Sequence, residues 1–210
     1  MADASPTNAS DGDTLPESND EKRSTKSSRT GKAIVHLSYA APDVDTLDLD
    51  NITFEQVPPE RCARETGGII APETRARGVT RLVGAYIPAV DGPGYMRSGA
   101  YECIALVAPS SVHKEGVVVG GCVFKPHSHP VRHGTCRFIE LALFAVENRC
   151  QGRKLGRRLM QFLKRHAFDT YQSEAILTFA DYKAFSFFKR VGYDRKIRTP
   201  ATVWKPNCVH

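Results

Sequence analysis

No run of apolar residues in the sequence approaches the roughly 20 residues that a membrane-spanning helix needs. The N-terminus also lacks the hydrophobic segment of a secretory signal. No CxxC pair occurs among the six cysteines, and in a reducing compartment isolated cysteines remain thiols instead of forming a disulfide framework. These absences predict an intracellular protein with no membrane partner and no disulfides.

The 210 residues, 41% of them hydrophobic, are enough to bury one good core but not to form two full domains. Residues 1–32 differ from the rest, because they are rich in Ser, Thr, Asp, Asn and Pro and offer almost nothing to bury. We expect a disordered tail over residues 1–32 and one folded domain over residues 33–210. Five basic residues of the tail could form a nuclear-import or nucleic-acid patch, although a solvated tail is the preferred interpretation.

Positive charge is concentrated in the last third of the chain. Residues 149–210 hold fourteen basic and four acidic side chains, a surplus of ten, whereas residues 33–148 hold ten basic and thirteen acidic ones. A cationic surface of this kind attracts phosphate groups, either on a nucleic acid or on a cofactor.

Alternating or continuous apolar patterns predict the strands of the domain. The patterns cover Ala33–Ala40, Tyr101–Ala108, Val117–Phe124, Arg137–Val146 and Ala175–Ala180. Helical spacing covers Val79–Ile87, Leu155–Phe168 and Tyr182–Tyr193, the last of which is closed by Gly192. The turn-prone PSSVHKEG should join an antiparallel hairpin, and the connection from Glu147 to Glu174 is long enough for a crossover between parallel strands. We therefore expect an α/β fold with a mixed central sheet flanked by helices and a further strand after the last helix.

One acidic residue, Glu140, lies inside an otherwise apolar strand pattern. Side chains alternate along a strand, so Glu140 should share a face with Phe138, Ala142, Phe144 and Val146. Apolar neighbours disfavour the charged carboxylate and raise its pKa toward the value that a general base needs near neutral pH. A glutamate at a sheet edge, paired with an arginine such as Arg137, is the alternative, and the strand pattern alone supports both.

The segment NRCQGRKLGRR connects this strand to the helix that opens near Leu155. Its backbone amides can point at an anion, while the helix dipole and the nearby cations favour negative charge. The segment would suit a pyrophosphate. A flexible turn with solubilising arginines would have the same composition, so both interpretations stay open.

Residues 117–197 resemble the catalytic core of the general-control (PCAF-type) histone lysine acetyltransferases, members of the GNAT superfamily of acetyl-CoA-dependent N-acetyltransferases. The resemblance is carried by the blocks VVVGGCVF, FIELALFAV, QGRKLGRRLM, ILTFAD and FFKRVGY, in family order. It implies the GNAT fold, acetyl-CoA as acetyl-donor substrate with no metal, and a protein lysine as acceptor, above all in histone tails. It also implies a nuclear protein, with the cytoplasm as a further location, and a multisubunit chromatin complex as a further partner. The basic regions add direct nucleic-acid binding as a weak property.

The resemblance assigns site residues by position. Glu140 matches the general base, which takes a proton from the substrate lysine through water. Phe144, Ala145 and Val146 match the strand segment whose backbone pairs with the pantetheine arm and the acetyl group. The pyrophosphate loop is matched by Gln151, Gly152, Arg153, Lys154, Leu155, Gly156 and Arg157. The place where the family's second helix borders the cofactor is matched by Lys183, Ala184 and Phe185.

Three of the departures from the family pattern bear directly on the site. Lys154 stands where the first glycine of the loop is expected, and that glycine allows close backbone approach to phosphate. Phe188 stands where many superfamily members carry a tyrosine that protonates the leaving thiolate, so solvent is expected to supply this proton. The connection Lys125–Cys136 is longer than the family's. We interpret it as a surface insertion near the active-site mouth, in preference to a zinc site formed by His127, His129, His133 and Cys136.

Three functions stay open from the sequence. The first is a histone or protein lysine acetyltransferase, in which the acid-rich stretch Pro42–Asp50 could assist a cationic peptide. The second is a GNAT enzyme that acetylates a small amine or a protein N-terminus. The third is a catalytically weak module that binds chromatin or nucleic acid through its basic regions. Glu140 favours the two enzymes, whereas Lys154 favours the binding module.

Overall fold

The computed structural model of the chain describes residues 41–67, 74–87 and 91–208. The chain divides into two units, residues 1–36 and 37–210, and all described residues belong to the second. The tail expected over residues 1–32 and the strand expected at Ala33–Ala40 lie outside the described residues. Among the helices of the described ranges, none is both long and apolar enough to cross a bilayer.

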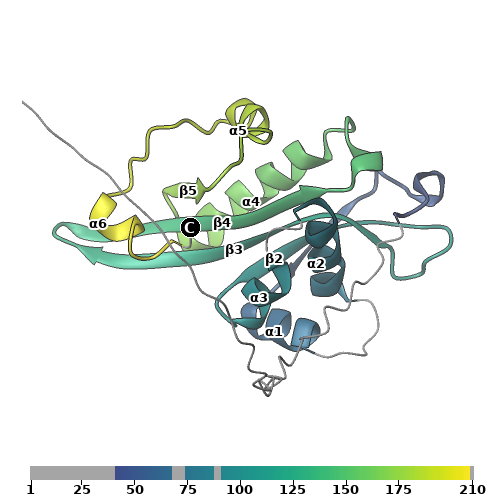
Figure 1. Cartoon of the computed structure of the whole chain (residues 1–210), viewed down its shortest axis with the longest axis horizontal. Helices are drawn as coiled ribbons and strands as arrows, with labels where there is room; N and C mark the ends of the chain where they lie inside the picture. The colour runs from purple at the N-terminus through teal and green to yellow at the C-terminus, as the bar shows by residue number, and fades with distance from the viewer. Residues whose placement is uncertain (1–40, 68–73, 88–90, 209–210) are drawn as a thin grey trace, which may run out of the picture. The chain divides into compact units, whose positions relative to one another are not determined.

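In the described part of the chain, five strands form one sheet, in the order β1-β2-β3-β4-β5 (Figure 1). The strands are β1 (Thr53–Val57), β2 (Glu102–Ala108), β3 (Val117–Val131), β4 (Gly134–Val146) and β5 (Ala175–Thr178). Strands β1 to β4 pair antiparallel, whereas β5 pairs parallel with β4. The parallel pair is connected through helix α4 (Leu155–Tyr171), since such a pair needs a long crossover. The mixed sheet and the β2–β3 hairpin expected from the sequence are confirmed.

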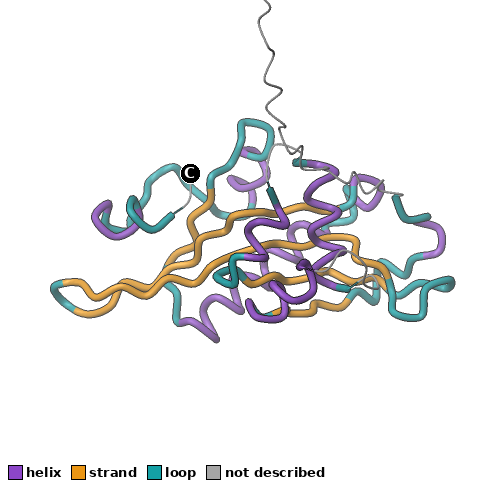
Figure 2. Tube along the Cα trace, turned by 60° about the horizontal axis from the view of Figure 1, so that its bottom comes forward, coloured by secondary structure: helices purple, strands orange, loops and turns teal. Residues whose placement is uncertain are grey.

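Helices cover both faces of the sheet (Figures 1 and 2). One face carries α1 (Pro59–Gly67), α2 (Arg75–Tyr86) and α3 (Gly92–Arg97), and the other carries α4 and α5 (Phe185–Arg190). The described ranges also contain α6 (Ala201–Trp204) and the 3-10 turns η1 (Val44–Thr46) and η2 (Asn148–Cys150). The helices expected from the sequence are confirmed as α2, α4 and α5. The sequence segments that form β1, α1 and α3 had shown no clear helical or strand pattern of apolar residues.

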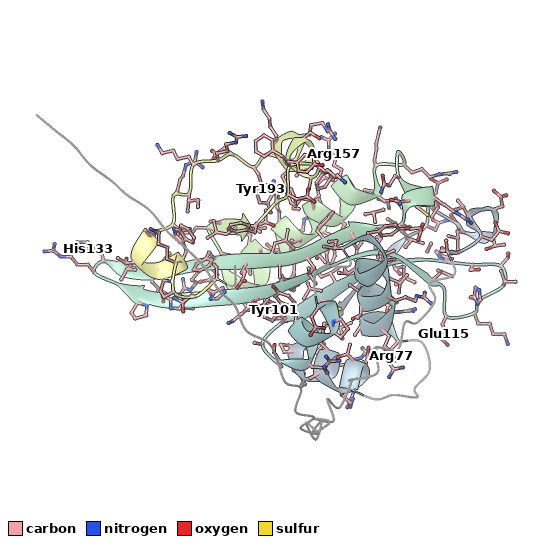
Figure 3. All side chains as sticks on the ribbon, viewed as in Figure 1. Arg77, Tyr101, Glu115, His133, Arg157 and Tyr193 are labelled. Atoms are coloured by element: carbon pink, nitrogen blue, oxygen red, sulfur yellow. The ribbon has the colours of Figure 1, made fainter. Side chains whose placement is uncertain are left out.

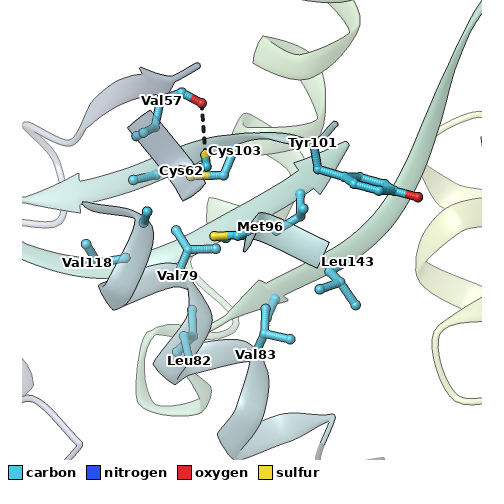
Figure 4. Close-up of a cluster of buried hydrophobic side chains, with 14 of the residues drawn as sticks. Val57, Cys62, Val79, Leu82, Val83, Met96, Tyr101, Cys103, Val118 and Leu143 are labelled. Carbon is cyan, nitrogen blue, oxygen red and sulfur yellow. Dashed lines mark hydrogen bonds between the residues drawn. The ribbon is translucent and has the colours of Figure 1, made fainter. Parts of the chain in front are cut away.

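Glycine allows α2 to pack closely on the sheet. A β carbon at Gly121 would lie 2.5 Å from Cγ2 of Val79 and 2.9 Å from the carbonyl oxygen of Ile104. A larger residue in β3 would therefore push the helix away. Figure 4 shows Val79 within the aliphatic cluster of this face, with the Tyr101 ring at its border and the hydroxyl directed out of the cluster.

Helix α4 buries one apolar side on the opposite face of the sheet. Leu159, Leu163 and Ala167 recur at helical spacing and pack in one buried cluster with Phe124 and Leu141. Each fully buried leucine contributes about 1.5–3 kcal/mol relative to an exposed one. This packing fixes the position of the first turn of α4, which follows the basic loop.

The β3–β4 hairpin corrects one prediction. The segment Lys125–Cys136, expected to be a surface insertion, continues both strands up to a turn at Arg132 and His133. Its two prolines had suggested a loop. Strand β2 pairs with β3 only as far as Phe124, so among the described residues the remainder of β3 is an edge strand, on which prolines are tolerated.

A β-bulge in β4 corrects a second prediction. Val123 pairs with Leu143 and Phe124 with Leu141, so Ala142 is the extra residue. The bulge shifts the alternation by one residue, and Leu143 and Ala145 join the cluster beneath α2. Phe144 and Val146, expected on the same face as Glu140, lie on the opposite face, where Phe144 packs against Phe187 and Phe188.

The C-terminal part differs from expectation in two ways. Strand β5 ends at Thr178 instead of Ala180, and within the described residues no strand follows α5. Gly192 does close α5, with a φ of +94°. The next residues fold locally, since the carboxylate of Asp194 accepts hydrogen bonds from the backbone N–H of Lys196 and from Arg198. Such side-chain bonds to nearby backbone compete with strand pairing.

Candidate active site

A pocket of about 290 Å³ opens where β4 and β5 separate. The two strands pair only from Phe138 to Leu141, so beyond that point β4 has no strand partner on this side within the described residues. The pocket is lined by residues of several elements, among them Tyr95, Glu140, Ala142, Leu177, Trp204 and Cys208. We call it the β4–β5 pocket. The free edge of β4 along Ala142–Val146 continues from it toward the loop that precedes α4.

Glu140 places a buried carboxylate at this pocket, with 5% of the residue exposed. Its Oε1 accepts a hydrogen bond from the Tyr101 hydroxyl at 3.2 Å, and its Oε2 lies 2.9 Å from Nε2 of His127. The surroundings are thus partly polar, unlike the apolar neighbourhood expected from strand alternation, and neither of these two contacts involves Arg137. The sequence reasoning connected neither Tyr101 nor His127 with Glu140, because Tyr101 precedes β2 and His127 lies on β3, far from Glu140 in local spacing.

Burial and the charge of Glu140 both raise the pKa values of two neighbouring groups, the Tyr101 hydroxyl and the Cys208 thiol. Burial is the main cause that raises the pKa of Tyr101 above its usual range, and the carboxylate adds to it. Burial also raises the pKa of Cys208 to about 11, with Glu140 adding to the effect and Lys125 opposing it. Both groups therefore stay protonated at neutral pH, and Tyr101 can serve as a hydrogen-bond donor to the carboxylate.

The loop before α4 has the backbone geometry of an anion site. Gly152 and Lys154 have φ values of +79° and +61°, so Lys154 holds the left-handed conformation that favours glycine. The side chain of Lys154 does not cap the helix, and the first N–H groups of a helix have no intrahelical acceptor. Together with exposed Arg153 and Arg157, this end of α4 fits a pyrophosphate in charge and in donors.

The other predicted residues of this loop have different environments. Gln151 is exposed and donates to the side chain of Asn148 at 2.6 Å. Leu155 is buried, with 2% exposed, so only its backbone can face a ligand. Its cluster includes Leu49, which places the acid-rich stretch Pro42–Asp50 beside the loop and outside the residues that line the β4–β5 pocket.

Helix α5 packs against the first turn of α4. A β carbon at Gly156 would lie 3.2 Å from the ring of Phe187, and Arg157 lies near α5 in Figure 3. Of the predicted residues at the start of α5, Ala184 donates its N–H to Asp181 at 2.7 Å. The ammonium of Lys183 lies over the Tyr182 ring, and the Phe185 ring faces the guanidinium of Arg195 at 4.4 Å. Phe188 is buried in the α4 cluster.

The structure thus joins a buried carboxylate, a free strand edge and a cationic helix N-terminus along one side of β4. A free edge can pair with an extended amide-bearing chain, and the helix end can bind phosphates. The carboxylate can accept a proton from a group that enters the pocket. This arrangement suits the transfer of a group carried on a long phosphorylated cofactor.

Comparison with known proteins agrees with this arrangement. Residues 104–195 match the family model described as the acetyltransferase (GNAT) domain. Histone acetyltransferase GCN5 of Yarrowia lipolytica is 33% identical over 98 residues, which cover 47% of this chain and 20% of that protein. Histone acetyltransferase GCN5 of Oryza sativa subsp. japonica is 31% identical over 94 residues, which cover 45% of this chain and 17% of that protein. This chain therefore spans about a fifth of the length of these curated relatives.

Solved structures give the same fold. The crystal structure of Tetrahymena GCN5 superposes with a TM-score of 0.53 at 25% identity, over 63% of this chain and 78% of that one. An aminoglycoside acetyltransferase from a soil metagenome superposes with a TM-score of 0.51 over 74% of this chain and 95% of that one. Its sequence is 11% identical, so this likeness shows the fold alone. The family match and the sheet topology together show the GNAT acetyltransferase fold over residues 104–195.

Proposed function

We propose that this protein is an acetyl-CoA-dependent lysine N-acetyltransferase that acts on histone tails or on another lysine-bearing protein. The observation that carries the proposal is the buried Glu140 carboxylate at the pocket where β4 and β5 separate. A lysine of a histone is favoured as the acceptor because the chain has 25–33% sequence identity to histone acetyltransferases GCN5 over the aligned part.

The donor acetyl-CoA supplies an acetyl thioester on a long arm that ends in a pyrophosphate. In the proposal, the loop from Gln151 to Arg157 and the N–H groups of the first turn of α4 hold the pyrophosphate. The backbone of Phe144, Ala145 and Val146 holds the arm along the free edge of β4. Lys183, Ala184 and Phe185, at the start of α5, border the same end of the donor.

Glu140 is the general base of this proposal. A lysine side chain is an ammonium ion at neutral pH and must lose a proton before its nitrogen can act as a nucleophile. The Glu140 carboxylate accepts that proton, directly or through a water molecule, inside a pocket that restricts solvent. Backbone amides of β4 beside the Ala142 bulge stabilise negative charge that develops on the carbonyl oxygen.

Tyr101 and His127 act as positioning residues for this base. Each contacts one oxygen of the carboxylate, so the pair restricts its rotation. The His127 ring is itself held by stacking on Phe138, with ring centroids 4.6 Å apart and planes 6° from parallel. Phe188 has no proton to donate, and the departing thiolate therefore takes its proton from solvent.

The proposed domain spans residues 33–210, and the proposed setting is the nucleus, within a chromatin complex that contributes substrate specificity. The exposed cations of the last third are assigned first to the donor phosphates, which leaves direct nucleic-acid binding as a weak secondary property.

A panel of acceptors tests the proposed function. Purified full-length protein is incubated with acetyl-CoA and, separately, with histone H3 and H4 peptides, the same peptides with blocked lysines, a peptide with only a free N-terminus, and spermidine. The proposal predicts CoA release with the lysine peptides and little with the others. Release with spermidine or the free N-terminus alone would assign another acceptor. Salt-sensitive DNA binding without any CoA binding would assign a binding module instead.

A further inference from the structure

Three side chains of metal-binding types converge beside the β4–β5 pocket, which two of them, Glu140 and Cys208, line. They are His127 of β3, Glu140 of β4 and Cys208, which follows α6. One ligand atom from each lies within 4.8 Å of the others, with His127 Nε2 only 2.9 Å from Glu140 Oε2. Residues separated by up to 81 positions are thus brought together by the hairpin extension and the C-terminal segment.

The surroundings hold these side chains in place. The Tyr101 hydroxyl donates to the second oxygen of Glu140 at 3.2 Å, and Phe138 stacks on the His127 ring. The backbone N–H of Cys208 donates to the carbonyl of Trp204 at 3.0 Å, which ties the thiol to α6. Such supporting contacts orient metal ligands and strengthen binding.

We propose that His127, Glu140 and Cys208 form a binding site for one zinc ion. A histidine, a carboxylate and a thiol are the ligand types that zinc takes, at about 2.0–2.3 Å, and three protein ligands leave a fourth position open. Magnesium and calcium prefer all-oxygen sites, so they fit less well. Zinc coordination displaces the Cys208 proton to solvent, because the thiolate is the ligand.

Zinc at this site inhibits acetyl transfer, because it occupies the carboxylate that accepts the substrate proton. This consequence rests on the proposed function, whereas binding of the ion does not. The other histidines and the cysteine of the hairpin are outside the site. His133 lies at the exposed turn, away from Tyr101 in Figure 3, and His129 faces Cys136 across the ladder. They provide matched controls.

Cobalt(II) titration tests the site directly. Full-length protein is freed of metal with a chelator and titrated with Co²⁺, and the thiolate-to-cobalt charge-transfer absorption is followed. Wild type and Cys136→Ser should show this absorption with one equivalent of cobalt, and zinc should displace it. Cys208→Ser should lose the absorption, and His127→Gln should weaken cobalt binding about a hundredfold or more. Zinc should also raise the Tm of wild type.

The outcomes separate the site from the activity. Absorption that is absent in wild type, or that survives in Cys208→Ser, would overturn the site. Inhibition is measured by CoA release, and the rate of each protein is expressed relative to its own metal-free rate. For half-inhibition, Cys208→Ser should need about a hundredfold more free zinc than wild type or Cys136→Ser. If the protein binds one equivalent of cobalt but has no acetyltransferase activity, the metal site is supported and the proposed function is wrong. Equal zinc sensitivity of wild type, Cys208→Ser and Cys136→Ser would contradict inhibition through this site.

Discussion

The hydroxyl of Tyr101 contacts the carboxylate that our account makes the base, and its removal should lower activity. A hydrogen bond to a charged group contributes about 1.5–3 kcal/mol, so Tyr101→Phe should lower kcat about tenfold or more. Tyr171→Phe is the matched control, since the Tyr171 hydroxyl donates to another buried glutamate, Glu102, outside the pocket. Both variants should lose stability, but only Tyr101→Phe should lose kcat, measured with saturating peptide and donor. Equal kcat values would contradict the positioning role.

Lys154 occupies a left-handed backbone position, which costs about 1–2 kcal/mol for a residue other than glycine. Glycine loses about 0.5–1 kcal/mol through the entropy of the unfolded chain, so Lys154→Gly should raise the free energy of unfolding by about 0.5–1 kcal/mol. Urea denaturation measures the change.

Gln172, with a φ of +51° at the other end of α4, is the matched position. Gln172→Gly should stabilise the protein by a similar amount. Only Lys154→Gly should alter CoA affinity, because only Lys154 borders the proposed pyrophosphate site. A change of CoA affinity in both variants would argue against that location.

At the residue scale, the sequence revealed Glu140 but not its partners. A single carboxylate in an apolar strand pattern is visible in the sequence, and so is a lysine in place of a loop glycine. The contacts with Tyr101, His127 and Cys208 depend on strand register and on the path of the C-terminal segment. Neither follows from local spacing, because both are set by long-range pairing.

Two glycines, Gly121 in β3 and Gly84 in α2, have opposite surroundings, and the close packing of α2 on β3 depends only on the first. Gly121→Ala would place a β carbon 2.5 Å from Val79 and should cost about 1–3 kcal/mol through overpacking. Gly84→Ala, in α2 itself, meets nothing within 4 Å and should stabilise the protein by about 0.5–1 kcal/mol. Urea denaturation of both variants checks the pair. A neutral Gly121→Ala would contradict the close approach.

At the element scale, the strongly periodic segments were predictable and the irregular ones were not. Helix α4 and strands β2, β3 and β4 follow their apolar patterns. The bulge at Ala142 leaves no mark in the sequence, yet it reverses the faces of Phe144 and Val146. The hairpin extension was hidden by its prolines, which an edge strand tolerates.

The stability of the whole molecule should fall at alkaline pH because buried thiols ionise only after unfolding. Burial raises the pKa of Cys122 from 9.0 to about 12 in the folded state. Below pH 9 the thiol is protonated in both states. Between pH 9 and pH 12 the unfolded state loses its proton first, so this group contributes a fall of about 1.4 kcal/mol per pH unit.

Urea denaturation between about pH 9 and pH 10 measures this slope, below the range in which most tyrosines ionise. Cys122→Ala should lower stability at neutral pH and reduce the slope in this window by about 1 kcal/mol per pH unit, because the unfolded thiol is only half ionised at pH 9. An unchanged slope would show that Cys122 does not titrate differently in the two states.

On the scale of the whole molecule, the sequence motifs correctly indicated the GNAT superfamily, and the family match and the sheet topology confirm it. The motifs span the part of the chain that binds the donor in the proposal. In the proposal, α3 and the C-terminal segment form the acceptor side, and the sequence of neither had shown a clear pattern. The structure was needed to bring Tyr95, Trp204 and Cys208 to the pocket.

The pH dependence of acetyl transfer by Glu140→Gln tests the central claim most directly. The variant keeps the size of the side chain but cannot accept a proton, so at neutral pH its rate of CoA release with a histone H3 peptide should fall about 10²–10⁴-fold. CoA binding, measured by calorimetry, should be unchanged. The rate should recover partly as the pH approaches the pKa of lysine, about 10.4, where the free amine forms without a base. Wild-type rates for Glu140→Gln at neutral pH would contradict the account.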